Sequence, residues 1–277
     1  FDRSFLKLSP NWALISSMDA DHLDIYGTAH HLIESFRLFS DMVEDGNLIV
    51  KEALDIPSKY TYALASDTAD FSAKNIRVEG GAYYFDLVYP KGVCENVITG
   101  LPGIHNVENA LAAFSMAYIQ GVSVSGIVDS IASFSGVKRR FEYHVKTDNQ
   151  IYIDDYAHHP KEIEVVIRSV RDLYPNKELT VIFQPHLFTR TRDFMDDFAK
   201  SLSFADRIML LDVYPAREFP IDGVNSEVLL NKITVKNKGL YDKSKFPEAI
   251  EKSPVIMTLG AGDIDELIQP IKAYLVS

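Results

Sequence analysis

From Gln150 onward, short apolar runs alternate with longer segments in which apolar residues recur every three or four positions. This alternation predicts a parallel β-sheet with helices on both faces, hence an α/β fold. Pro160 stands where the first turn of a helix tolerates proline. The predicted buried face of the helix that follows consists of Ile163, Val166, Ile167, Val170 and Leu173. The expected elements are 151–154, 161–173, 179–183, 191–202, 207–213, 227–233, 255–259 and 264–275.

The first half of the chain has a mixed pattern. We expect a strand at 12–17, antiparallel hairpins over 47–99 around Gly80-Gly81, and a helix at 124–134. A helix over 28–43 should bury Leu32, Ser35, Phe36, Phe39 and Val43. A helix opening near Asn106 should bury Ala110, Ala113, Phe114 and Ala117. The basic segment 138–141 separates the two patterns, so we predict domains at 1–138 and 139–277.

Composition narrows the classes of protein to consider. The length of 277 residues is enough for about two domains. A net charge of −11 argues against nucleic acid as a partner, because phosphate binding needs a basic face. No apolar run approaches the roughly 18 residues that span a membrane. The lone Cys94 predicts a reducing, cytoplasmic location. Because the chain starts at Phe1 without a signal-peptide pattern, we expect it to be a piece of a longer protein.

Two charged turns, 154–160 and 184–192, each follow an apolar run. Ligands of α/β sheets bind in the turns after strands. Asp155 could accept both hydroxyls of a ribose, and His158 at the next helix start could face phosphate. The alternative is that Asp154 or Asp155 only caps the helix while the histidines lie at the surface.

The second turn carries His186, Arg190 and Arg192. An arginine fork suits carboxylate or phosphate. Two cations near a helix start are disfavoured by the helix dipole, so an anionic ligand explains them better than stability does. The alternative, a solvated face, stays open.

Two further groups could bind ligands. His22, among Asp19, Asp21 and Asp24, is either a metal ligand suited to Mg²⁺ or part of a solvated acidic turn. His105, Asn106 and Asn109 begin a helix, and an amide can read both the donor and the acceptor of an adenine edge. The alternative for Asn106 is an N-cap. Gly260-Ala261-Gly262 is weak evidence alone, and the sequence contains neither a dinucleotide fingerprint nor a P-loop.

Several motifs resemble those of the Mur ligase family, which builds the peptide of bacterial peptidoglycan. Residues 101–113 are similar to its proline-glycine, His-Asn and Asn-Ala-Leu-Ala-Ala signature, and 154–160 to its Asp-Tyr-Gly/Ala-His-His-Pro turn. Residues 1–6 and 21–24 are similar to its central ATPase domain. Residues 184–193 with 211–216 are most similar to the branch that joins L-alanine to UDP-N-acetylmuramate. The resemblance covers the whole chain in order.

The resemblance implies a partial central ATP-binding domain with a mixed sheet, lacking its P-loop, at 1–138. It implies a Rossmann-like C-terminal domain with a mostly parallel sheet at 139–277. The implied activity is an ATP- and Mg²⁺-dependent carbon–nitrogen ligase in peptidoglycan synthesis. Its substrates would be UDP-N-acetylmuramate, L-alanine and ATP, and an acyl phosphate its intermediate. Without a P-loop, this chain alone should fold but not ligate, and it could self-associate through an uncovered sheet edge.

The resemblance also implies roles for single residues. His22 would hold Mg²⁺, and Arg140 would reach the phosphates. Arg190 would bind the carboxylate of L-alanine, with His186 near its amine. The other nucleotide contacts would be His105, Asn106, Asn109, Asp155, Tyr156 and His158. Ile104 and Leu187 depart from the arginines common in relatives, and Leu187 reduces the charge that this loop offers to substrate.

Three other functions remain open. A recycling ligase would attach an intact tripeptide to the same sugar nucleotide, although the 184–192 loop favours the alanine-adding reaction. A non-catalytic module would only hold a nucleotide or a partner. A nicotinamide dehydrogenase would need the glycine fingerprint that this sequence lacks.

Overall fold

The computed structural model describes residues 3–18, 28–44, 46–250 and 253–277. The chain forms two compact units: Phe1–Gly100 with Ile104–Phe134, and Leu101–Gly103 with Ser135–Ser277. The α/β class predicted from sequence is confirmed. The domain boundary at 138/139 stays a prediction.

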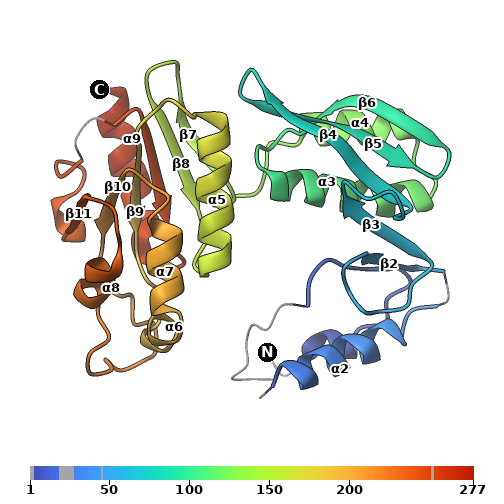
Figure 1. Ribbon diagram of the computed structural model, residues 1–277, viewed down its shortest axis with the longest axis horizontal. Coiled ribbons are helices and arrows are strands. Elements are labelled where there is room, and N and C mark those ends of the chain that lie inside the picture. The colour runs from blue at the N-terminus through green and yellow to red at the C-terminus, as the bar shows by residue number, and fades with distance from the viewer. Residues whose placement is uncertain (1–2, 19–27, 45, 251–252) are drawn as a thin grey trace. The chain divides into compact units, whose positions relative to one another are not determined.

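The first unit contains a mixed sheet whose strands follow chain order in the described residues (Figure 1). They are β1 Ala13–Ile15, β2 Leu48–Lys51, β3 Tyr60–Leu64, β4 Phe71–Glu79, β5 Ala82–Tyr89 and β6 Gly92–Ile98. Strands β4, β5 and β6 are antiparallel, and Gly80 and Gly81 join β4 to β5 with positive φ of 59° and 77°.

The prediction of hairpins throughout 47–99 is wrong for its first half. The pairs β1–β2, β2–β3 and β3–β4 are parallel. The run Leu48–Val50 is buried throughout, as expected of a parallel strand covered on both faces rather than a half-exposed hairpin strand.

The helices of the first unit are η1 Ser4–Lys7, α2 Ala29–Ser40, α3 Ile104–Ile119 and α4 Val124–Ser133 among the described residues. On α2, Thr28 caps the N-terminus by accepting a hydrogen bond from His31 N at 3.3 Å. Its predicted residues Leu32 and Ser35 are buried, while Phe36 and Phe39 are half-buried. The helix ends at Ser40, and the buried Val43 follows it.

The predicted buried face of α3 is wrong except for Phe114. The helix contacts β3, β4 and β5, and its buried residues are Val107, Leu111, Ala112, Phe114 and Ser115. Ala113 is exposed, and Ala110 and Ala117 are half-buried. The buried face includes the large apolar side chains Val107, Leu111 and Phe114, because burial of apolar surface stabilises roughly in proportion to its area.

The second unit contains a sheet with the strand order β11-β10-β9-β12-β8-β7 in the described residues. The strands are β7 Glu142–Lys146, β8 Ile151–Asp155, β9 Leu179–Phe183, β10 Arg207–Leu210, β11 Asn237–Leu240 and β12 Val255–Leu259. All pairs are parallel except β7 with β8, so the predicted mostly parallel sheet is confirmed. The edge strands β7 and β11 were not predicted, because their half-exposed residues lack a continuous apolar run.

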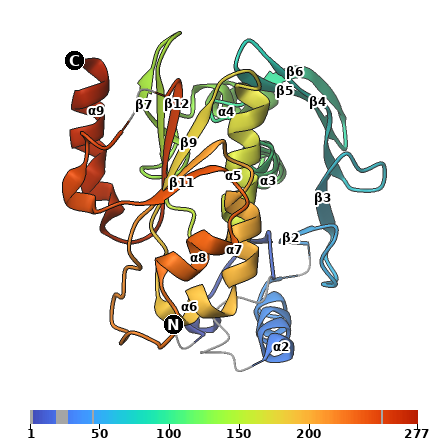
Figure 2. The same cartoon turned by 60° about the vertical axis from the view of Figure 1, so that its left-hand side comes forward.

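Helices cover both faces of this sheet, as Figures 1 and 2 show. One face carries α9 Ile268–Val276, and the other carries α5 Pro160–Leu173 and α7 Met195–Leu202. The remaining helices in the described part are α6 Phe188–Asp193, α8 Ser226–Lys232, η2 Lys243–Lys245 and η3 Asp263–Leu267. All five residues predicted for the buried face of α5 are buried. None of the helices in the described residues is long and apolar enough to cross a membrane.

Two predicted helices are each divided in the structure. The segment 191–202 breaks at Phe194, which leaves helical geometry with φ −119° and ψ 22°. Its ring meets that of His159 at 4.7 Å, so tertiary packing favours the break. The segment 264–275 likewise divides into η3 and α9.

A buried ion pair fastens the start of the second unit to its sheet. Asp154, with no exposed surface, accepts hydrogen bonds from Arg139 Nε at 3.0 Å and Thr258 Oγ1 at 2.6 Å. Arg139 Nη2 also donates to Gly260 O at 2.6 Å. The segment before β7 is thereby tied to β8 and to the loop after β12.

We expect Asp154→Asn to lower the free energy of unfolding by about 3–5 kcal/mol, because it leaves the Arg139 charge buried and uncompensated. Urea unfolding of this chain measures the effect. The matched control is Glu164→Gln on the more exposed pair Arg168–Glu164, which should cost about 0–1 kcal/mol. Equal, small losses for both variants would show that the buried pair does not fasten this unit.

Candidate functional site

The carboxyl ends of β8, β9, β10 and β12 bring four loops to one edge of the second sheet. Gly260 N donates to Asp155 O at 3.3 Å, and Gln184 N donates to Leu259 O at 3.1 Å. A Cβ on Gly262 would lie 2.4 Å from Gln184 Oε1 and 2.8 Å from Tyr214 Cβ. The Gly-Ala-Gly segment is therefore needed for close packing between loops, at the edge where α/β proteins bind ligands.

Asp155 is a buried carboxylate at the end of β8, with 4% of its surface exposed. Its oxygens accept hydrogen bonds from Phe141 N at 2.7 Å and Ala157 N at 2.8 Å. Burial raises the pKa of Asp155 to about 6, against the lowering effect of these two amides. It fastens the residue before β7 and the turn after β8, and its predicted contact with ribose stays a prediction.

Helix capping does not explain the two aspartates. The amides of His158 and His159 at the start of α5 donate instead to Glu162 Oε2, at 3.0 and 3.2 Å. The capping interpretation of Asp154 and Asp155 is therefore wrong.

Four rings form a row that joins the two predicted turns and continues into the loop after β10. The centroids of Tyr156 and His158 are 5.2 Å apart, and those of His158 and His186 are 6.2 Å apart. His186 stacks on Tyr214 at 5.6 Å with a 15° interplanar angle. The structure thus brings together residues that lie up to 58 positions apart, from Tyr156 to Tyr214.

The ring of Tyr156 also lies close to two arginine side chains. The guanidinium groups of Arg139 and Arg140 lie 5.2 and 5.7 Å from its ring centroid. Tyr156 N donates to Arg139 O at 2.8 Å, which holds the start of this turn in place. A half-exposed aromatic face beside two cations is suited to a nucleotide, which offers a base to stack and phosphates to pair.

His186 is held in its neutral form. Burial lowers the pKa of His186 to about 4, and the positive charges of Arg190 and His158 add to this effect. Its Nδ1 atom is buried and has no hydrogen-bond partner among the described residues. A neutral imidazole of this kind can accept a hydrogen bond from a ligand.

The two arginines of the second turn differ. Arg192 is exposed and pairs with Asp193 at 2.7 Å, which fits the solvated-face interpretation. Arg190 is half-buried, and its guanidinium makes no hydrogen bond or ion pair within the described part of the chain. Arg190 is therefore the cation of this turn that is available to an anionic ligand.

His105, Asn106 and Asn109 belong to the first unit, in the first turns of α3. Because the helix already begins at Ile104, Asn106 is not its N-cap, and that interpretation is wrong. Asn109 is exposed and donates from Nδ2 to Asn106 Oδ1 at 3.3 Å. The paired amides keep one shared orientation, and their predicted contact with adenine stays a prediction.

No group of three or more His, Cys, Asp or Glu side chains within 3–18, 28–44, 46–250 and 253–277 could hold a metal ion. The predicted ligand His22 lies outside the described residues.

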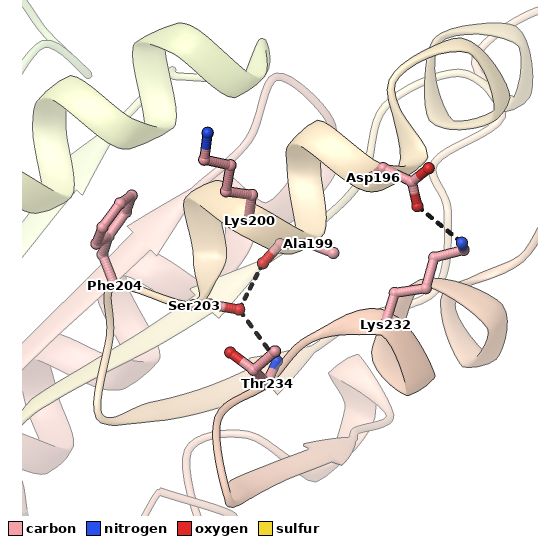
Figure 3. A pocket seen from close by; sticks show the side chains of 7 residues that line it. All are labelled: Asp196, Ala199, Lys200, Ser203, Phe204, Lys232 and Thr234. Carbon is pink, nitrogen blue, oxygen red and sulfur yellow. Dashed lines mark hydrogen bonds and ion pairs between the residues drawn. The ribbon is translucent and has the colours of Figure 1, made fainter.

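A cavity of about 550 Å³ lies elsewhere, beside α7 and α8, and contains none of the predicted site residues (Figure 3). Its polar groups pair with each other: Lys232 with Asp196 at 2.7 Å, and Thr234 N with Ser203 Oγ at 3.0 Å. Lys200 also lines this cavity, but among the described residues no buried polar atom without a hydrogen-bond partner lines it beside Lys200, in contrast to Arg190 and His186.

Sequence reasoning missed two residues of the site, Tyr214 and Glu218. Tyr214 stacks on His186, and Glu218 accepts hydrogen bonds from Thr189. Both lie in the loop after β10. The signal that could have identified them is the one used for the other turns, a polar segment directly after an apolar run.

Two family models match the chain. The Mur ligase middle domain matches residues 3–117, and the glutamate ligase domain of Mur ligases matches residues 139–264. The chain is 52% identical over its whole length to a UDP-N-acetylmuramate–L-alanine ligase of Christiangramia forsetii, covering 61% of that protein. It is 51% identical over 99% of its length to the corresponding ligase of Flavobacterium psychrophilum, covering 62% of it.

The fold matches the crystal structure of UDP-N-acetylmuramate–alanine ligase from Thermotoga maritima. The TM-score is 0.83 at 23% identity, over 99% of this chain and 61% of that one. A murein peptide ligase from Psychrobacter arcticus matches with a TM-score of 0.64 at 21% identity, over 98% of this chain and 58% of that one. The chain thus spans about three-fifths of the length of these relatives, and with its middle and glutamate ligase domains it belongs to the Mur ligase family.

Proposed function

We propose that this chain works in an ATP-dependent ligase that joins L-alanine to UDP-N-acetylmuramate in peptidoglycan synthesis, in the cytoplasm. Two relatives about half identical to it along nearly all of its length carry that name. The observation that carries the proposal is the unpaired Arg190 beside the neutral His186, at the edge where α/β sheets bind ligands.

The turn 184–192 carries groups that could bind both the carboxylate and the amine of an amino acid. The guanidinium of Arg190 can bind a carboxylate with two parallel hydrogen bonds. The neutral imidazole of His186 can accept a hydrogen bond from the amine, which a protonated imidazole could not do. Together these groups would orient the amine for attack on an activated carboxylate, which is catalysis by positioning.

The first turn would hold the nucleotide. Tyr156 offers a ring face, Arg140 a charge for the phosphates and His158 a further polar contact. Asp155 would accept a ribose hydroxyl with a lone pair that the backbone amides leave unused. For His105, Asn106 and Asn109 of the first unit, contact with adenine is a separate proposal.

The proposed reaction begins when the lactyl carboxylate of the sugar nucleotide attacks the γ-phosphate of ATP. The amine of L-alanine then attacks the resulting acyl phosphate, and phosphate leaves. Members of the family generally need Mg²⁺, but the described residues do not form a site for it, so no step is assigned to the metal. The proposed ligand His22 can be tested by Mg²⁺ titration of His22→Ala.

We expect Arg190→Ala, made in the protein encoded by the complete gene, to raise the KM for L-alanine much more than that for ATP. Loss of one desolvated, charge-assisted contact should cost about 2–5 kcal/mol in kcat/KM for L-alanine. Arg190→Lys should restore only part of this, because an ammonium cannot reproduce the planar fork. Steady-state phosphate release measures each constant.

The exposed Arg192→Ala is the matched control and should change the KM for L-alanine little. Loss of ATP affinity with L-alanine affinity kept would move Arg190 to the phosphate side. A wild-type protein that accepts the intact tripeptide but not L-alanine would favour the recycling ligase. Nucleotide binding without either ligation would favour a non-catalytic module.

The depressed pKa of His186 predicts a pH dependence of stability. Its folded-state pKa of about 4 lies below the unfolded value near 6.5, so the folded state binds fewer protons. Its stabilising contribution is therefore complete above about pH 6.5 and is lost as the pH falls toward 4. His186→Asn should lose less stability than wild type between pH 7 and pH 4, as measured by urea unfolding at a series of pH values.

A further inference from the structure

The loop after β10 carries a carboxylate that reaches the turn after β9. Glu218 Oε2 accepts a hydrogen bond from Thr189 N at 2.9 Å, and Oε1 accepts one from Thr189 Oγ1 at 2.5 Å. Although burial acts in the opposite direction, the hydrogen bonds from Thr189 lower the pKa of Glu218 below its usual value. Glu218 is therefore an ionised group whose two oxygens both accept hydrogen bonds from Thr189.

The turn that Glu218 holds has a strained backbone. Leu187 has φ 72°, in the left-handed region that non-glycine residues rarely adopt. Leu187 N donates to Tyr214 O at 2.9 Å, and Tyr214 N donates to Pro185 O at 2.8 Å. The loop after β10 thus fastens this turn twice, through the backbone of Tyr214 and the side chain of Glu218. Such a conformation persists only where its surroundings fix it.

Arg190 directly follows the clamped residue. Among the described residues, neither oxygen of Glu218 forms an ion pair with Arg190, and each accepts a hydrogen bond from Thr189. The guanidinium therefore stays without a partner in the described residues, although a carboxylate binds the neighbouring residue. The clamp fixes the backbone beside Arg190 and leaves its charge available.

We propose that Glu218 is a positioning residue of the amino-acid site: by clamping Thr189, it sets where Arg190 presents its guanidinium to the substrate carboxylate. The proposal rests on the proposed function of Arg190. A misplacement of about 1 Å outside the reacting centre can cost on the order of 100-fold in rate, so a clamp next to the binding group has a measurable effect.

The first test measures the KM values for L-alanine, ATP and UDP-N-acetylmuramate one by one, in the protein encoded by the complete gene. Glu218→Ala should raise the KM for L-alanine about tenfold or more and change those for ATP and UDP-N-acetylmuramate less than about twofold. Glu218→Gln should retain most of the wild-type value, since an amide can accept from Thr189 N and donate to Thr189 Oγ1. The matched control is Glu227→Ala, which removes an exposed carboxylate in the first turn of α8.

The partner residue supplies a second set of variants. Thr189→Val removes the hydroxyl contact and keeps the amide, so its KM for L-alanine should lie between wild type and Glu218→Ala. Thr189→Ser keeps the hydroxyl and should match wild type. In the double variant, Thr189→Val should add less to Glu218→Ala than it does alone, because the two remove the same contact.

Hydrogen exchange of the Thr189 amide in this chain gives a readout that needs no activity. Glu218→Ala should speed the exchange, and Glu227→Ala should leave it unchanged. If Glu218→Ala raises the KM for L-alanine, ATP and UDP-N-acetylmuramate by the same factor, or leaves all three at their wild-type values, Glu218 is not a positioning residue. A wild-type protein that does not ligate L-alanine would instead overturn the proposed function, even where Thr189 exchange responds to Glu218→Ala.

Discussion

The buried carboxylates at the end of β8 are the constraint on which the second unit depends. A carboxylate removed from water is stable only when hydrogen bonds or opposite charges replace its hydration. Asp154 is satisfied by Arg139 and Thr258, and Asp155 by the amides of Phe141 and Ala157. The same contacts hold Arg139 and Phe141 in left-handed conformations, with φ of 59° and 50°. The segment that leads into the sheet and the turn that follows β8 are thus fixed together.

The candidate site contains two kinds of polar group, and the difference between them is informative. Asp154, Gln184, Glu162 and Glu218 are all engaged by the protein itself, so they set the shape of the loops. Arg190 and the Nδ1 atom of His186 have no such partner within the described residues. The four engaged side chains hold the loops in place. Arg190 and His186 therefore keep defined positions while their polar atoms stay available to a ligand. Binding sites generally need this combination of a supported frame and unused polar groups.

Sequence reasoning succeeded where one local pattern decided the outcome. Helix α5 was predicted down to its buried residues, because five large apolar side chains leave only one helical face to bury. The parallel sheet followed from continuous apolar strands. It failed where tertiary contacts decided, as in the pairing direction of β2 and β3 and the buried face of α3. Both histidine turns were recognised as local motifs. A local pattern could have marked the loop that contains Glu218, but not its contact with Thr189, which lies 29 residues away.

The guanidinium of Arg190 and the imidazole of His186 are electrostatically coupled, and this coupling bears on the proposed chemistry. The charge of Arg190 helps to lower the pKa of His186 in the absence of a ligand. A carboxylate bound to Arg190 neutralises most of that charge, so the proton affinity of His186 rises when the acid end of an amino acid is in place. The amine of the same molecule then meets an imidazole that accepts a hydrogen bond more strongly than before binding. A ligand that lacks the carboxylate does not cause this change, so Arg190 would both hold the amino acid and, through His186, favour ligands that carry a carboxylate.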